Sequence, residues 1–415
     1  MRQAIIKIMW KMTKGIFNNL EEIEEPRDAQ AREETTLEKL LETGEILVRK
    51  YACEFKRFDD ITNFDRYEVY DQMYTELKEQ LLKDVHFTDD DIKSYVMAKA
   101  NNDNEWNESQ ALGAYTGALL QLFTERNRLQ GKPTVFYING NGIRFDYLFF
   151  YAREIERLIV ENFIGDNICR SIGISSNGFT NQVIGINITG NYVLASIGKL
   201  RGSIEQIIGV GIKGNGALSS IGSDKGMVNQ VLGIDIDGCA ALERVGTPGG
   251  RLNQVIGYGI KGDKALNSSG TAYAHINQII GVYIEGNQVM GNIGINDGYI
   301  DMIFGAHIKG KHIFNGIGTG TTAKQLGLVK RQPGLVKELG YHDSHKISTY
   351  MRCGHIICGA RAESMYEQMV RETHLEEIAA LARSMQGKPC QEVLAIADEL
   401  YAMRPEVPKG FFGRK

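Results

Sequence analysis

The sequence predicts an α+β protein in which a central β-solenoid of about six 24-residue coils is capped by helical regions at its N- and C-terminal ends. The segment Asn181–Gly185 returns in related form five times, always after 24 residues. Inside each return apolar residues alternate with period two, as in a strand with a buried face. The flanks instead show helical apolar spacing. A stacked coil between helical flanks accounts for all three observations.

The first 30 residues predict an amphipathic N-terminal helix, because Arg2, Lys7, Lys11 and Lys14 interrupt an apolar cluster. The uninterrupted apolar runs are too short for a signal-peptide core or a membrane span. Two interpretations are open for residues 1–20: contact with an anionic membrane surface, and packing on the protein's own body. Packing is favoured.

Residues 31–164 predict a helical domain. Thr88 and Asp91 have the spacing of a capping box, so a helix is expected to begin there. A second helix is expected over residues 105–128. The segment 134–146 predicts a short β-hairpin, because two apolar runs flank Asn139-Gly-Asn-Gly. An apolar helix over residues 147–163 is expected to lead into the repeats.

Residues 165–320 form the predicted repeat domain and hold about two thirds of the 47 glycines. In the first full unit the alternation Ile184, Ile186, Ile188 predicts one buried strand face, with equivalent residues of successive coils stacked inside the coil. A glycine closes each strand, and two further glycine corners follow. Three corners in 24 residues indicate one solenoid coil, since a propeller blade needs about 40 residues.

Residues 321–415 predict a C-terminal helical region, with helices over 360–386 and 391–403. The exposed strand edges at both ends of a solenoid need covers that prevent strand addition. The two helical flanks are expected to supply them.

An Asn-Gln pair opens most repeats and is the most regular polar feature. One interpretation is a ladder of exposed amides that binds a polymer or a sugar. The favoured interpretation is structural, with stacked amides bonded from coil to coil.

Five possible metal ligands lie within 17 residues, a density that suits a structural zinc site. The cluster lacks a Cys-x-x-Cys pair, and its cysteines are equally compatible with buried apolar positions. No other cofactor is expected. The candidate zinc ligands are His342, His345, Cys353, His355 and Cys358.

The net charge of −4 and the pI of about 6.1 argue against nucleic acid as a partner, because such proteins show a clustered basic face. Six dispersed cysteines do not form a secreted disulfide framework, so a cytoplasmic, reducing location is expected. Glycines near Gly142 lack the spacing and the Lys-Ser/Thr pair of a phosphate loop. No nucleophile elbow or His-Glu-x-x-His helix occurs.

The unit from Gly185 to Asn191, with the Ile-Gly pair at Gly198, resembles the glycine-rich β-helix of the glutamate synthase C-terminal domain and the similar β-helix of formylmethanofuran dehydrogenase. The resemblance covers the central repeats alone. It implies a structural spacer and transfers no catalytic residue. This sequence has a longer period, and its Asn-Gln pair has no counterpart there.

Two functions are therefore expected. The first is a non-catalytic scaffold whose rigid solenoid binds a protein partner or a second copy of itself. The second is a subunit or domain of an enzyme with its site between the solenoid and the helical flanks.

Overall fold

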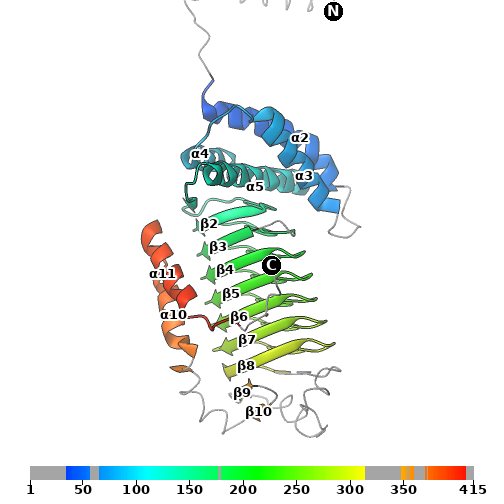
Figure 1. The fold of residues 1–415 in the computed structure, drawn as a ribbon, viewed down its shortest axis with the longest axis vertical. Helices are drawn as coiled ribbons and strands as arrows, with labels where there is room; N and C mark the ends of the chain where they lie inside the picture. Colours follow the sequence, from blue (N-terminus) through cyan, green and yellow to red (C-terminus); the bar gives the residue numbers. More distant parts are fainter. Residues whose placement is uncertain are drawn as a thin grey trace, which may run out of the picture.

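The computed structural model describes residues 34–56, 65–175, 179–313, 347–352, 355–358, 370–371 and 373–407. Its ten strands form a single sheet in chain order, and β1 to β8 run parallel in a solenoid of about seven turns. The coils stack into a rod, with helices at the β1 end and two more helices along one side (Figure 1). The parallel strands are β1 Val135–Asn139, β2 Glu154–Glu161, β3 Phe179–Ile186, β4 Ser203–Val210, β5 Met227–Ile234, β6 Arg251–Tyr258, β7 His275–Val282 and β8 Tyr299–Ile308.

A helical cap covers the β1 end of the rod, as the sequence predicts. The predicted capping box at Thr88 is present. The central helix of the cap packs directly on the first coil, because Gly113 and Gly117 let its backbone approach: a Cβ there would lie 2.2 Å from the Tyr147 carbonyl oxygen and 2.3 Å from that of Phe150. The cap consists of α2 Thr36–Lys56, α3 Asp65–Glu76, the π-helical segment η1 Leu77–Leu81, α4 Asp89–Lys99 and α5 Trp106–Leu129.

The predicted hairpin at 134–146 and the predicted helix at 147–163 are both wrong. Strand β1 pairs with β2 in parallel, and residue 144 forms a parallel bridge with residue 164. The coil stack therefore begins near Val135, upstream of the predicted boundary at 165. The first two spacings differ from 24: Val135 pairs with Arg157 (157 − 135 = 22) and Arg157 with Gln182 (182 − 157 = 25). These unequal lengths hide the repeat in the sequence.

The apolar rows of the strands lie on two faces, whereas the sequence predicts a single interior face. Val183 and its equivalents point into the coil, where they pack with Ile188 and Leu194. Ile184 and Ile186 point outward and are nevertheless fully buried, because C-terminal helices cover them. The strands thus read as apolar on both faces, which is typical of a covered parallel sheet.

The covering helices are α10 Leu375–Ser384, which lies inside the predicted range 360–386, and α11 Cys390–Ala402, which begins and ends one residue before the predicted range 391–403. They lie along the side of the rod and not over its end (Figure 1). At the far end, β9 Ile347–Arg352 adds antiparallel to β8 and pairs with β10 His355–Cys358. A short pair of strands thus occupies the edge that the sequence assigns to helices. None of the described helices has the length and apolar run that crossing a membrane requires.

The glutamines of the repeats form a buried ladder, as the structural interpretation predicts. Gln182, Gln206, Gln230, Gln254 and Gln278 are joined by amide hydrogen bonds of 2.7 to 2.9 Å. Two rungs also donate to backbone carbonyls of α11, from Gln206 to residue 397 and from Gln230 to residue 400, each at 3.0 Å. The ladder therefore fixes both the coil register and the position of α11.

The side of the coil after the first corner alternates between positive and negative φ. Tyr192, Leu194 and Ser196 all have φ between 56° and 58°, and the later coils repeat the pattern. The intervening positions carry β-branched residues such as Val193 and Ile197. No Val, Ile or Thr has positive φ among the described residues. β-Branched side chains are strained at positive φ, which explains why they occupy only the intervening positions on this side of the coil.

Candidate functional site

A polar groove of about 690 Å³ lies where the helical cap meets the first corners of the rod. One wall comes from the start of α5 and the loop before it. The other wall comes from the corners that follow the first strands. The lining residues are Asn104, Trp106, Ser109, Gln110, Arg144, Asp146, Tyr147, Asp166, Asn167, Arg170, Asn191, Tyr192 and Asn215.

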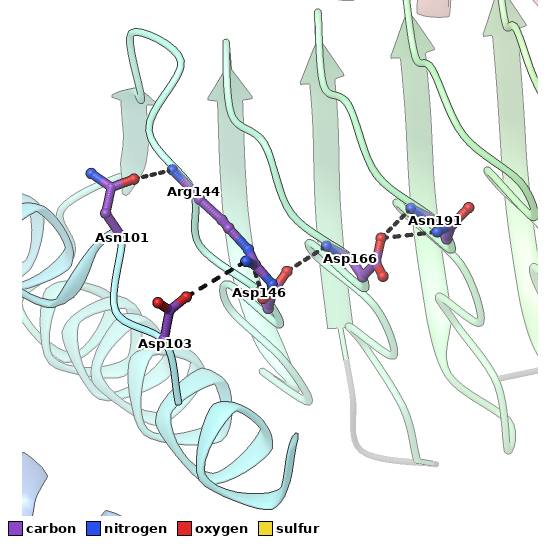
Figure 2. Close-up of polar contacts among 6 residues, drawn as sticks. All are labelled: Asn101, Asp103, Arg144, Asp146, Asp166 and Asn191. Carbon is purple, nitrogen blue, oxygen red and sulfur yellow. Dashed lines mark hydrogen bonds and ion pairs between the residues drawn. The ribbon is translucent and has the colours of Figure 1, made fainter. Parts of the chain in front are cut away.

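The rod wall is a chain of short side chains, each of which binds the backbone of the next coil (Figure 2). Asp146 Oδ1 accepts from the Asp166 amide at 2.8 Å, and Asp166 Oδ1 accepts from the Asn191 amide at 2.7 Å. Asn191 Oδ1 in turn accepts from the Asn215 amide at 3.0 Å. Asp166, Asn191 and Asn215 each follow a corner glycine, and coil stacking places them in a row with Asp146.

The cap is tied to this row through the corner at Arg144. The Arg144 amide donates to Asn101 Oδ1, and the Asn101 amide donates to the Arg144 carbonyl, both at 2.8 Å. The Arg144 guanidinium binds Asp146 Oδ2 through two nitrogens, at 3.1 and 2.7 Å, and lies 3.9 Å from Asp103 (Figure 2). The hydrogen-bonded Asp146 carboxylate raises the pKa of Arg144. Arg144 therefore connects the cap, through Asn101, to the corner of the rod at Asp146.

Two half-exposed aromatic side chains border the groove, Trp106 at 44% and Tyr192 at 48% exposure. The Tyr192 ring lies over Gly216 of the next coil, where a Cβ would come within 2.5 Å of the ring. The guanidinium of Arg170 lies 5.3 Å from the centre of the same ring, and Arg170 also donates to Asn167 Oδ1 at 2.7 Å. Contacts from the coils before and after thus fix the Tyr192 ring.

Residue 216 is a glycine because the Tyr192 ring needs the space of its side chain. The backbone conformation at this position does not itself require glycine. Its φ is +70°, yet Ala240, Lys264 and Gln288 adopt similar angles at the same position of later coils. A side chain is therefore compatible with the backbone. Only the coil that follows Tyr192 has glycine at this position among these units.

Gln110 lies at the base of the groove with 1% exposure. Its Nε2 donates to the Tyr147 hydroxyl at 3.3 Å, while its Oε1 has no hydrogen-bond partner within the described part of the chain. A buried acceptor left without a partner costs about 1–3 kcal/mol. Gln110 is therefore an enclosed residue of the groove lining with an unused hydrogen-bond acceptor.

The charges of the groove balance. Two arginines and two aspartates line it, so 2 − 2 leaves no net charge. The arrangement offers hydrogen-bond donors and acceptors at fixed positions beside apolar ring surfaces, which is a combination suited to binding. Both aspartates are already engaged with backbone amides or Arg144.

The sequence-predicted zinc site stays a prediction. His342, His345 and Cys353 lie outside the described residues, and His355 and Cys358 lie on β10, where the structure describes only the backbone. Over the residues that are described, no three His, Cys, Asp or Glu side chains gather as metal ligands do. The predicted membrane contact of residues 1–20 also lies outside the described part.

A second hollow, of about 700 Å³, lies at the third corner of the coils and is mainly apolar. Leu200, Pro248 and Tyr273 line it, and Tyr273 is 76% exposed. Its lining also holds Arg201, Asp224 and Lys225, and Tyr273 offers an exposed aromatic control position at a different corner of the coils.

The sequence analysis did not assign a binding role to the Asn or Asp that follows most of the corner glycines, and it did not identify Trp106, Gln110 or Arg144 as site residues. One signal was present in the sequence: the position of Tyr192 carries Gly, Ala, Lys and Gln in the following units. A large aromatic residue in one unit of a regular repeat marks a local role. The cap residues carry no such signal, because only folding brings them to the corners.

Comparison with known proteins adds no relative: no family model matches the chain, and neither does any curated protein or solved structure.

Proposed function

We propose that the chain is a non-catalytic scaffold protein, in which a rigid solenoid holds the polar groove as an interaction surface for a partner molecule. The observation that carries this proposal is the row from Asp146 to Asn215. Each of these side chains binds the backbone of the next coil, so the groove is preformed. A preformed surface loses little conformational entropy when a partner binds.

The rest of the rod is consistent with a supporting role. Its amide ladder is bonded internally, and the apolar outer row of its strands is covered by α10 and α11. The groove, in contrast, combines exposed aromatic rings with fixed polar groups. Aromatic residues are enriched at the centres of binding surfaces because they contribute large contact areas.

Site-specific photo-crosslinking in the source cells tests the proposal. A photoreactive amino acid replaces Tyr192 in one variant and Tyr273 in the control variant. We expect a discrete crosslinked product from position 192 only, and the purified partner should then bind the unmodified chain and lose affinity on Tyr192→Ala. Equal crosslinking from both positions, or none from either, contradicts the proposal.

A second candidate is an enzyme, and one observation favours it: the groove lies between the solenoid and a helical flank, where that hypothesis places a site. Substitution of Asp166 can distinguish the scaffold function from the enzyme function. Its Oδ1 accepts two bonds from Asn191, which an amide oxygen can also accept, and asparagines already have this role in the next coils.

Asp166→Asn therefore preserves the corner and removes the carboxylate. A scaffold should keep partner affinity within about threefold, since a neutral amide oxygen replaces the carboxylate oxygen as acceptor of the same Asn191 bonds. Acid–base chemistry at this carboxylate would instead fall by a factor of about 10² or more. Loss of a measured turnover in this variant, with partner binding intact, would establish the enzyme and overturn the scaffold proposal.

A further inference from the structure

We propose that the groove binds a neutral carbohydrate chain through Trp106, Tyr192 and the buried amide of Gln110. This inference rests on the proposed function, because it names the chemical class that the same surface recognises. Three properties of the groove select the class: its charge balance, its fixed polar row and its exposed rings.

Charge balance disfavours the common charged ligands. Nucleic acids and acidic polymers bind through uncompensated Lys and Arg, and their affinity grows with the number of phosphates or carboxylates neutralised. Here Arg144 is engaged with Asp146, and the four charged groups of the lining sum to zero. A neutral ligand meets no unfavourable field in this groove.

The polar row and Gln110 require a ligand that both donates and accepts hydrogen bonds. Sugar hydroxyls have one donor and two acceptor lone pairs each, as serine hydroxyls do. The Gln110 Oε1 has no partner and almost no accessible surface, so a sugar hydroxyl pairs with it only when the Gln110 side chain turns toward the groove. The row of side chains from Asp146 to Asn215 runs along successive coils, so it presents polar groups at regular intervals to a bound carbohydrate chain.

The aromatic rings fit the apolar faces of sugar rings. The electron-rich face of an aromatic ring attracts the polarised C–H groups of a pyranose face. Tyr192 is held by Gly216 and Arg170, and Trp106 stands at the start of α5. Rigid Trp and Tyr side chains provide contact area at low entropy cost. Together these features describe a carbohydrate site better than a peptide site, which would need free backbone edges or a deep apolar pocket.

Tryptophan fluorescence gives a direct test, because the chain has two tryptophans and Trp10→Phe leaves Trp106 alone. The full-length Trp10→Phe protein is titrated with neutral hexasaccharides of glucose (α- and β-linked), mannose, galactose, xylose and N-acetylglucosamine. We expect a saturable emission change with at least one of them at millimolar or lower concentration. An oligogalacturonate and a proline-rich peptide, added in the same way, should give none.

Three variants in the Trp10→Phe background decide whether the groove is responsible. Tyr192→Ala should weaken binding about tenfold, as loss of an aromatic anchor does. Gln110→Met should also weaken binding, yet it should leave the unfolding temperature unchanged or higher, because it removes an unpartnered buried oxygen. Tyr273→Ala should leave the affinity unchanged.

The carbohydrate inference is overturned if no hexasaccharide gives saturable binding, if only the acidic oligomer or the peptide binds, or if Tyr192→Ala leaves the affinity unaltered. Its failure differs from failure of the scaffold proposal. Position 192 would still crosslink to a partner if the scaffold proposal holds with another ligand class, whereas both experiments would be negative if it does not.

Discussion

The substitution Leu218→Ile tests whether left-handed backbone on one side of each coil dictates which apolar residue can lie there. Leu218 is fully buried at φ 55°, and its Cδ1 fills the space beside Gly209 and Gly233, whose absent side chains make room for it. Isoleucine has the same volume but branches at Cβ. The branched Cβ clashes with left-handed backbone, and the shortened reach leaves the space by the glycines unfilled.

The expected cost combines two parts. Strain of a β-branched residue in a sparsely populated backbone region is about 1–3 kcal/mol. A volume-conserving change of shape adds less than about 1.5 kcal/mol. Together they should lower the free energy of unfolding by about 1–4 kcal/mol. Leu218→Met should show only the packing cost and no backbone strain, since Met290 already occupies the same position of a later coil at φ 50°.

Urea unfolding followed by circular dichroism measures the difference, and hydrogen exchange locates it in the coil. Ile207→Leu is the matched control, because it makes the reverse change at an equally buried position on a strand. It should cost less than about 1.5 kcal/mol. If Leu218→Ile and Leu218→Met differ by less than about 0.5 kcal/mol, backbone handedness does not select the residue and the reasoning is refuted.

Three further perturbations test other parts of the structure. Gly216→Ala should lower the unfolding free energy by about 1–3 kcal/mol through overpacking against Tyr192, and adding Tyr192→Ala should recover part of that loss in a double-mutant cycle. Gln206→Leu removes an inner rung with ladder bonds on both sides and should cost about 1–3 kcal/mol, more than Gln278→Leu, which loses one ladder bond, from Gln254, and a contact of its Nε2 with a methionine sulfur at 3.6 Å; equal costs would contradict a continuous ladder. Burial and a hydrogen bond to a glutamate of α10 raise the pKa of Tyr258 to about 12. Because this lies above the value of about 10 for an unfolded tyrosine, stability is retained below pH 10 and falls as pH rises toward 12, and Tyr258→Phe should make that decline measurably shallower.

The amino-acid sequence by itself determined the repeat, because period and alternation are local properties. The 24-residue steps from Asn181, the glycine corners and the stacked glutamines are all confirmed by the register of β3 to β8. The capping box at Thr88 and the helix over residues 105–128 are confirmed for the same reason, since neighbouring residues alone specify them.

Spacing also explains where sequence reasoning was wrong. The first coil departs from 24 residues, so its strands resembled a hairpin and an apolar helix. Its alternating positive φ at Tyr147, Phe149 and Tyr151 matches the later coils, but φ is not visible in a sequence. Parallel pairing between β1 and β2 appears only when the coils are stacked.

Tertiary structure alone decided which apolar rows face the coil interior and where the groove lies. The sequence shows that Ile184 and Ile208 are apolar enough to be buried, but it does not show on which face of the strand. They lie on the outer face of the coil and are buried because α10 and α11, about 200 residues downstream, pack over them. The groove likewise joins Gln110 to Tyr192 across the cap and three corners. Contacts between distant segments depend on how elements pack, and local pattern carries no information about that packing.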